Sequence, residues 1–413
     1  MYKKTFILFS SILSVYLVHA QISVTKLWSM KANPTLNSIN GVAFKADGQK
    51  VISGTNCHPA SIRMFDSNTG NLDWDYTVGS AFMCIMGVTF SGSGNYIAAV
   101  EEFGNILIFD NTGATPVIVD TIKTLTSYAF SIAFSPDNSK VAVGCSSNRL
   151  KIYNIPGGTL AHNIVAHTGW VTAVAYSPDG TKIVTGGTDD KVKIWTSTGT
   201  LLHTLSGHTG DITSVKFSPD NTKIVSASKD DKIRIWDANT GTLIKVTNAH
   251  NKDVNGIDVS PDGTKIVSVS ADSTGKIWDF ATGNLLYTFG VSDSGVVNAV
   301  AWSPLGDKIV TGSAKSDVVM WKVTVSSNID DSNILSAWSI YPNPAQNTIQ
   351  VTLPTLLKNA KLAIHNLLGE LVQSYEINSI HNDLDISYLP HGLYLCTLEY
   401  HQNRVSRKLF IQR

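Results

Sequence analysis

Three segments of the chain each carry a histidine, a hydroxyl residue and an aspartate, the residue types of a general base, a nucleophile and an orienting acid. In each segment the hydroxyl residue follows the histidine by 18 positions, and the aspartate follows four positions later. The three sets are His167, Thr185 and Asp189; His208, Ser226 and Asp230; and His250, Ser268 and Asp272. Gathered in one open cleft, such a set would suit a hydrolase.

The repetition of the set favours a structural role over a catalytic one. Catalysis requires one exposed constellation with an oxyanion site beside it, whereas this trio occurs in three equivalent places. A buried polar network is tolerable when every member is paired, and it then specifies one strand register. We therefore predict that the three sets stabilise the fold.

The elements that position these residues are short strands. Residues 167–195 (HTGWVTAVAYSPDGTKIVTGGTDDKVKIW) contain three alternating runs rich in Val, Ile and Thr, which predicts three antiparallel strands. The pattern recurs along the chain, with Ser-Pro or equivalent turns 41 to 43 residues apart, at Ser135, Ser177, Ser218, Ser260 and Ser303. This period, with four strands per unit, is typical of a β-propeller blade.

The three central copies resemble the WD-repeat family. Each has the loop histidine, the hydroxyl on the second strand, the turn aspartate and a third-strand tryptophan, at Trp195, Trp236 or Trp278. Two copies also carry the Trp-Asp dipeptide that gives the family its name, at Trp236 and Trp278. The resemblance implies a hydrogen-bonded chain from tryptophan through hydroxyl and histidine to aspartate in each blade.

Two weaker copies at residues 43–54 and 89–100 bring the number of predicted units to seven, over residues 21–323. The last unit lacks an obvious fourth strand, which residues 22–30 could supply by pairing with residues 318–323. Such closure would remove an unpaired strand edge. Units one, two, three and seven depart from the pattern, and we expect lower local stability there, because the turn aspartate is replaced by Pro59, Phe103, Ser147 and Lys315.

The N-terminal 20 residues are predicted to be a signal peptide. Lys3 and Lys4 precede an apolar run of 13 residues that ends in small residues at Ala20. This run is short for a membrane span, which takes about 20 apolar residues. The chain has 32 basic and 32 acidic residues, so no charge excess points to nucleic acid. We expect no transmembrane segment in the mature chain, and a monomer.

The outer loops of the propeller are where we expect a ligand to bind. Candidate rim residues lie just after the loop histidines or at similar points in the less regular units: Trp170, Asp211, Asp253, Phe82 and Tyr128. Aromatic anchors of this kind suit a protein, peptide or glycan partner. The alternative is that Trp170 only packs against the neighbouring blade.

No cofactor or metal is expected. The turns that follow the third strands carry one carboxylate each, too few for a calcium loop. The four cysteines are Cys57, Cys84, Cys145 and Cys396. A disulfide between Cys57 and Cys84 stays open, with free buried thiols as the default.

The C-terminal region, after a polar linker at residues 324–339, lacks the blade period. It resembles the C-terminal sorting domain of type IX secretion substrates over residues 340–413. The resemblance rests on Tyr341, Pro342, Asn343 and Pro344 at its start, Gly369 in the middle, Pro390, Gly392, Leu393 and Tyr394 further on, and Lys408 near the end. It implies handling by the type IX secretion machinery and a location at the outer cell surface or outside the cell.

We therefore predict an all-β chain: a seven-bladed β-propeller followed by a small β-sandwich-like domain. The predicted function is that of an exported, non-enzymatic binding platform. The alternatives are a hydrolase- or lyase-like enzyme with a site in the central channel, and a structural part of a surface or motility assembly.

Overall fold

The computed structural model describes residues 21–31, 38–56, 60–78, 84–123, 127–290, 295–326, 338–353, 360–400 and 403–413. Every regular element in these ranges is a β-strand, so the described chain contains no helix that could cross a membrane. The predicted signal peptide and most of the predicted linker lie outside the described residues. Two compact units are present, one over Ile22–Thr324 and one that includes the C-terminal residues from Val325.

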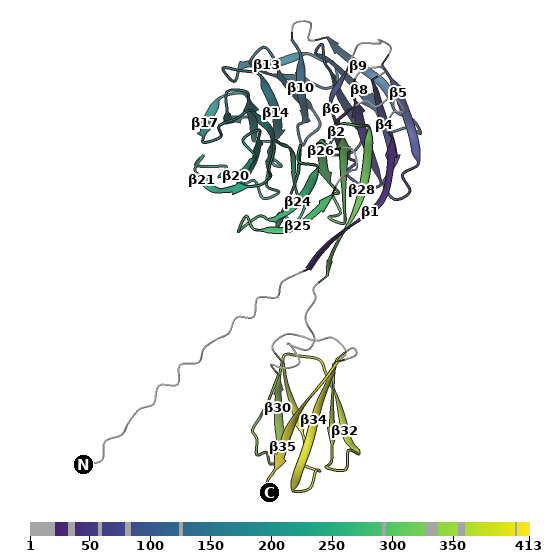
Figure 1. Ribbon diagram of the computed structural model, residues 1–413, viewed down its shortest axis with the longest axis vertical. Helices are drawn as coiled ribbons and strands as arrows, with labels where there is room; N and C mark the ends of the chain where they lie inside the picture. The colour runs from purple at the N-terminus through teal and green to yellow at the C-terminus, as the bar shows by residue number, and fades with distance from the viewer. Residues whose placement is uncertain are drawn as a thin grey trace, which may run out of the picture. The chain divides into compact units, whose positions relative to one another are not determined.

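The first unit contains seven four-stranded antiparallel sheets, numbered here as blades 1 to 7 (Figure 1). Blade 1 is β2 (Ile39–Phe44), β3 (Lys50–Thr55), β4 (Ser61–Asp66) and β5 (Leu72–Thr77); blade 2 is β6 (Ile85–Phe90), β7 (Tyr96–Glu101), β8 (Asn105–Asp110) and β9 (Val117–Lys123); blade 3 is β10 (Ala129–Phe134), β11 (Lys140–Cys145), β12 (Arg149–Asn154) and β13 (Leu160–Val165); blade 4 is β14 (Val171–Tyr176), β15 (Lys182–Gly187), β16 (Lys191–Thr196) and β17 (Leu201–Ser206). Blade 5 is β18 (Ile212–Phe217), β19 (Lys223–Ser228), β20 (Lys232–Asp237) and β21 (Leu243–Asn248); blade 6 is β22 (Val254–Val259), β23 (Lys265–Ser270), β24 (Thr274–Asp279) and β25 (Leu285–Gly290); blade 7 is β26 (Val297–Trp302), β27 (Lys308–Ser313), β28 (Asp317–Ser326) and β1 (Gln21–Lys31).

The first strands of the blades form the inner ring. Each contacts the first strand of the next blade, and β26 of blade 7 contacts β2 of blade 1. The second strands are buried along nearly their whole length, as Ile224 and Val225 are in β19. Their buried runs consist of apolar and small residues, as in KIVSAS of β19, which suits burial on both faces. The core therefore lies between neighbouring sheets; one cluster joins Val184 of blade 4 to Trp236 of blade 5.

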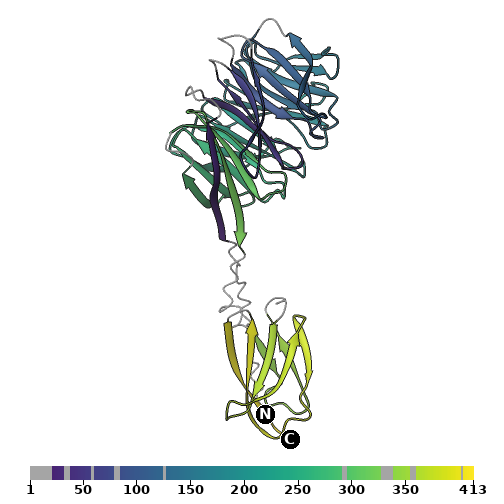
Figure 2. The same cartoon turned by 90° about the vertical axis from the view of Figure 1, so that its right-hand side faces the viewer.

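The ring is closed by the two ends of the propeller sequence. Strand β1 pairs with β28 at the outer edge of blade 7, and the two strands lie side by side in every view (Figures 1 and 2). Ile22 and Val24 point into the blade core, while Leu27 on the same strand is 43% exposed. The indole of Trp28 donates a 3.1 Å hydrogen bond to the carbonyl of Ser67 in blade 1. The first strand thus completes one blade and contacts the next.

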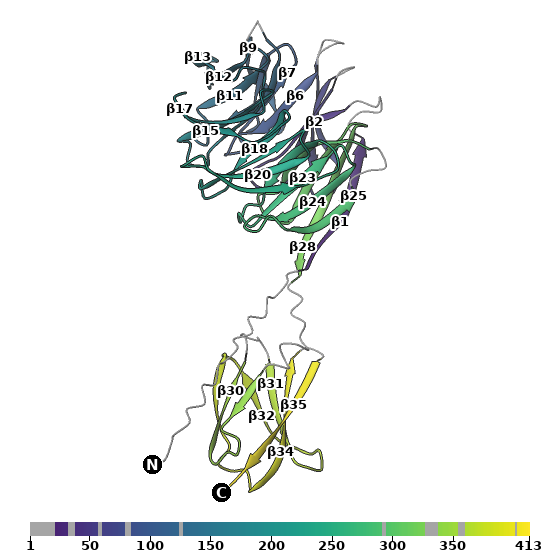
Figure 3. The same ribbon diagram turned by 60° about the vertical axis from the view of Figure 1, so that its left-hand side comes forward.

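The C-terminal unit consists of two antiparallel sheets around a common core (Figure 3). One sheet contains β29 (Ser339–Tyr341), β30 (Thr348–Thr352) and β33 (His381–Asp385), and the other contains β32 (Leu371–Ile377), β31 (Ala360–His365), β34 (Gly392–Tyr400) and β35 (Asn403–Ile411). Ile349 of the first sheet and Leu362 and Cys396 of the second belong to one buried cluster. The all-β class predicted for both parts is confirmed.

Candidate binding surface and buried histidine networks

The histidine, hydroxyl and aspartate of each central blade lie in one hydrogen-bonded chain with the tryptophan. In blade 4, His167 Nδ1 lies 2.8 Å from Asp189 Oδ1, and His167 Nε2 lies 2.8 Å from Thr185 Oγ1. Trp195 donates its indole proton to the same Thr185 oxygen over 2.9 Å. Because a carboxylate can only accept, the imidazole proton is on Nδ1, and Nε2 accepts from the threonine hydroxyl.

Blades 5 and 6 repeat this geometry. The histidine to aspartate and histidine to hydroxyl distances are 2.9 and 2.8 Å in both blades, between His208, Asp230 and Ser226, and between His250, Asp272 and Ser268. Trp236 and Trp278 donate to the two serines over 2.9 and 2.8 Å. The three hydroxyl residues have no exposed surface and the three histidines are buried, whereas the aspartates are partly buried. Every member of the chains is paired.

Burial also fixes the ionisation of these groups. Loss of solvent lowers the pKa of His167, His208 and His250 below that of a free imidazole, although the aspartates oppose the shift. The aspartates remain ionised. In blade 6, burial alone would raise the pKa of Asp272, but hydrogen bonds from Thr274 and the Asn251 backbone, with the His250 interaction, lower it to about 2.

Blade 5 contains an additional buried charge. Arg234 Nη1 donates to Asp230 Oδ2 over 2.7 Å, and the two side chains are 8% and 2% exposed. The corresponding residues of blades 4 and 6 are Lys193 and Lys276, which donate to backbone carbonyls and do not pair with the aspartate. Hydrogen bonds from His208 and Arg234 therefore hold the pKa of Asp230 far below its usual range, against the effect of burial.

The four irregular blades use other arrangements. In blade 7, Trp321 still donates to the hydroxyl of Thr311 over 3.0 Å. In blade 1, the buried hydroxyl of Ser53 has no partner among the described residues. Phe103, Ser147 and Lys315 are exposed, and Pro59 lies outside the described residues. Lower stability in these blades stays a prediction.

A stability measurement against pH tests the buried histidines. Because their folded-state pKa values are lowered, the unfolded chain binds more protons than the folded chain below about pH 6.5. The free energy of unfolding should therefore fall as the pH is lowered from 7.5 to 5.5, by up to about 1.4 kcal/mol per pH unit for each histidine. Urea denaturation at several pH values measures this slope. His250→Gln should remove about a third of it, and a flat profile for the unmodified chain would contradict the assignment.

Exposed aromatic rings lie on the rim at the same end of the strands as the histidine loops. Trp170, directly before β14, is 50% exposed, and its ring stacks on Phe130 of blade 3 with centroids 5.4 Å apart. Phe103 and Tyr128 are 48% and 44% exposed, with centroids 5.7 Å apart. Trp170 thus both packs against the neighbouring blade and remains open to solvent. We call Phe103, Tyr128, Phe130 and Trp170 the aromatic rim.

The other candidate rim residues contribute less. Asp211 forms an ion pair with Lys229 over 2.9 Å, and Asp253 is partly buried before β22. Phe82 lies outside the described residues. Phe103 and Phe130 were not predicted as rim residues; Phe103 was noted only as a departure from the aspartate pattern.

The central channel encloses a cavity of about 310 Å³ lined by the first strands of the blades. Its lining combines aliphatic side chains with polar ones, among which Lys216 and Asp258 form an ion pair over 3.3 Å. The second oxygen of Asp258 accepts the backbone proton of Trp302 over 2.8 Å. Within the described residues, no group of three or more histidine, cysteine, aspartate or glutamate side chains is placed to hold a metal.

The cysteines are in two states. Cys84 is disulfide-bonded, so the default of free thiols is wrong for this residue. Cys57, the partner that the sequence left open for it, lies outside the described residues. Cys145 and Cys396 are free and buried.

In the C-terminal unit, the sequence motif around Asn343 holds the last strand. The Asn343 side chain donates to the carbonyl of Lys408 over 2.8 Å and accepts the backbone proton of Phe410 over 2.9 Å. Tyr394 donates its hydroxyl proton to the carbonyl of Pro390 over 3.0 Å. Of the remaining motif residues, Tyr341 ends β29, Pro342 and Pro344 lie between β29 and β30, Gly369 lies between β31 and β32, and Gly392 and Leu393 start β34.

The Asn343 contacts give a testable prediction. Asn343→Ala removes both hydrogen bonds to β35 and should destabilise the C-terminal unit by about 1 to 2 kcal/mol. Proteolysis within residues 403–413 should become faster, and export of the chain should fall. Gln346→Ala, an exposed neighbour, is the control. Unchanged proteolysis of the Asn343 variant would show that its two hydrogen bonds to β35 are dispensable.

Comparison with known families agrees with this geometry. The family described as WD domain, G-beta repeat matches residues 120–154, 158–196, 199–237, 241–279 and 283–322. The family described as Secretion system C-terminal sorting domain matches residues 339–412. A search of curated proteins found no match to the chain. The chain therefore contains WD repeats arranged as a β-propeller and a type IX secretion C-terminal sorting domain, which indicates export to the cell surface or beyond.

Proposed function

We propose that the propeller is a non-enzymatic binding platform outside the cell and that its ligand, a protein, peptide or glycan, binds on the aromatic rim. WD repeats suggest a protein-binding role in general. The observation that carries the proposal is the exposure of Phe103, Tyr128 and Trp170, each close to half exposed, across three consecutive blades.

The rim has the geometry of a contact surface. Tyr128 lies directly before β10, and Phe130 is the second residue of this strand, at an irregularity in its pairing with β11. Tyr128 contacts the ring of Phe103, and Phe130 contacts the ring of Trp170, so the two ring contacts are adjacent along the chain. Large exposed apolar patches on soluble proteins mark interaction sites, and aromatic anchors dominate binding energy in such sites.

The distribution of polar groups supports a non-enzymatic role. A catalytic serine needs its histidine partner and a substrate on the same open face. Here Ser226 accepts from Trp236 and bonds to His208 without any exposed surface. In the central channel, Lys216 and Asp258 are paired with each other. These polar residues are thus paired with one another inside the propeller.

Capture of surface proteins and glycans by the full chain, followed by measurement of Kd for the captured ligand, tests the proposal. Trp170→Ala and Phe103→Ala should each weaken binding about 30-fold, as expected for loss of an aromatic anchor worth about 2 kcal/mol. Leu285→Ala is the matched control, because this leucine is 49% exposed on the outer strand of blade 6. Equal affinities of the Trp170 and Leu285 variants would overturn the proposal.

A further inference from the structure

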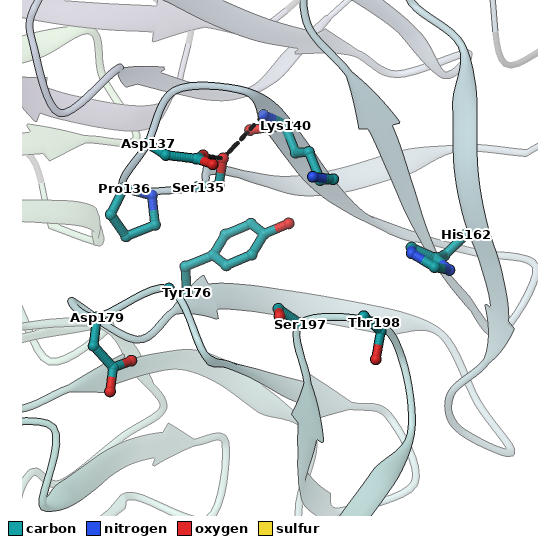
Figure 4. Close-up of a pocket in the computed structure, with 10 residues that line it drawn as sticks. Ser135, Pro136, Asp137, Lys140, His162, Tyr176, Asp179, Ser197 and Thr198 are labelled. Carbon is teal, nitrogen blue, oxygen red and sulfur yellow. Dashed lines mark hydrogen bonds between the residues drawn. The ribbon is translucent and has the colours of Figure 1, made fainter.

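A cavity of about 430 Å³ lies between blades 3 and 4, at the opposite ends of the strands from the aromatic rim. It is bounded by the turn between β10 and β11, by His162 of β13, by Tyr176 at the end of β14, and by Ser197 and Thr198 between β16 and β17. Figure 4 shows the Tyr176 ring between Lys140 on one side and Ser197 on the other, with His162 on a separate strand beyond them.

The neighbouring interface, between blades 4 and 5, shows why this cavity exists. There Lys182, which occupies the position of Lys140, donates to Asn239 Oδ1 over 2.6 Å and to the carbonyl of Ala238 over 3.2 Å. His203, in the register position of His162, lies 2.8 Å from the carbonyl of Asn239. The turn of blade 5 therefore fills the interface and satisfies both side chains.

In blade 4 the corresponding turn is one residue shorter. Four residues, 197–200, connect β16 to β17, whereas five, 238–242, connect β20 to β21. The shorter turn does not reach the preceding blade in the same way. Among the described residues, the Lys140 ammonium and the His162 ring make no hydrogen bond, although the charge of Lys140 acts on Asp137, and both side chains line the cavity.

Tyr176 adds a third donor. Its position at the end of the first strand holds phenylalanine in blades 1, 2, 3 and 5, as at Phe134 and Phe217. The Tyr176 hydroxyl is buried and has no partner among the described residues. Burial raises the pKa of Tyr176, so the phenol keeps its proton at neutral pH. A buried, unpaired O–H group is costly, which favours a ligand atom that accepts its hydrogen bond.

Two acidic residues also line the cavity, and the charge of Asp137 acts on Lys140 and Tyr176, but the hydrogen bonds of both carboxylates are made within their own turns. Asp137 accepts hydrogen bonds from Ser135 and Ser139, and Asp179 accepts them from Ser177 and Thr181, so both carboxylates are engaged in their own turns. An ammonium, a phenol, an imidazole and two hydroxyls that line one cavity suit an oxyanion on a ligand that also carries hydroxyl groups.

We propose that the cavity between blades 3 and 4 binds a small carboxylate ligand of the size of one sugar acid, with Lys140 and Tyr176 on the carboxylate and His162, Ser197 and Thr198 on its hydroxyl groups. The site is separate from the aromatic rim, and it does not depend on the function proposed for that surface.

Titration calorimetry of the full chain with D-glucuronate tests the proposal, with D-glucose and inorganic sulfate as the other arms. Glucuronate should bind, and glucose and sulfate should bind at least 10-fold more weakly. Tyr176→Phe should weaken glucuronate binding by about 10-fold or more, as expected for a lost hydrogen bond to a charged group. Phenylalanine occurs at the same position in four other blades, so this variant should fold. Lys140→Met should weaken binding further.

A turn replacement provides an independent check. Exchanging residues 196–200 for the sequence Asp-Ala-Asn-Thr-Gly-Thr of residues 237–242 should fill the cavity, abolish glucuronate binding and leave the fold intact. The proposal is wrong if glucuronate does not bind at tens of millimolar, if glucose or sulfate binds equally well, or if Tyr176→Phe leaves the affinity unchanged.

Discussion

Deletion of residues 21–31 should convert the propeller into an unstable, aggregating chain. The deletion removes the buried side chains of Ile22 and Val24, worth about 1.5 to 3 kcal/mol each, together with the hydrogen bonds between β1 and β28. It also removes the contacts of Trp28 with blade 1. Together these losses should amount to about 5 kcal/mol or more. A domain is typically stable by only about 5 to 15 kcal/mol, so the loss is a large fraction of the total.

The exposed edge left by the deletion accounts for the aggregation. Strand β28 would present unpaired backbone groups, which template pairing with other chains. Size-exclusion chromatography and thermal melts measure the effect. Leu27→Ser is the control on the same strand, because Leu27 is 43% exposed and should tolerate the change. A deletion variant that stays monomeric with an unchanged Tm would refute closure by β1.

Asp230→Ala should be the most destabilising single substitution among the three networks. It leaves Arg234 buried without its carboxylate and removes the acceptor of His208, which should cost about 3 to 5 kcal/mol. Asp189→Ala removes the partner of His167 but leaves no buried cation unpaired, because Lys193 donates to a backbone carbonyl. This variant should lose about 1 to 3 kcal/mol of stability.

Urea denaturation of the two variants and of Ser147→Ala separates these effects. Ser147 occupies the corresponding position of blade 3 and is exposed, so its substitution should change stability by less than about 0.5 kcal/mol. Arg234→Met in the Asp230→Ala background should recover part of the loss. Equal shifts for Asp230→Ala and Ser147→Ala would contradict the network account.

The periodic features of the chain could be predicted from the sequence because the same residue pattern recurs in each repeat. The 41 to 43 residue period predicts the four-stranded units, and the resemblance to the WD-repeat family implies the contacts among His208, Ser226 and Asp230. Closure by residues 22–30 could be predicted because the last unit lacks a strand and the first is preceded by one. The structure places both segments in blade 7.

The features that depend on a single departure from the repeat could not be predicted in the same way. Phe103 replaces a network aspartate, and only its stacking on Tyr128 shows that it extends the rim. The cavity at Lys140 arises from a turn shortened by one residue. The shorter turn is visible in the sequence, but it does not predict a cavity unless the position of the neighbouring blade is known. The hydrogen bonds of Asn343 reach residues that are 65 and 67 positions later in the chain, and local sequence patterns do not indicate contacts at that separation.

Nitrogen-15 NMR of the histidine rings tests most directly whether the repeated trios hold the blades together and leave recognition to the outer loops. The rings of His167, His208 and His250 should be neutral and unchanged from pH 8 to below pH 6.5, and those of His167 and His250 should be protonated on Nδ1. A ring among the three that titrates at the pH of a free imidazole would show that this histidine is open to solvent and would contradict the account.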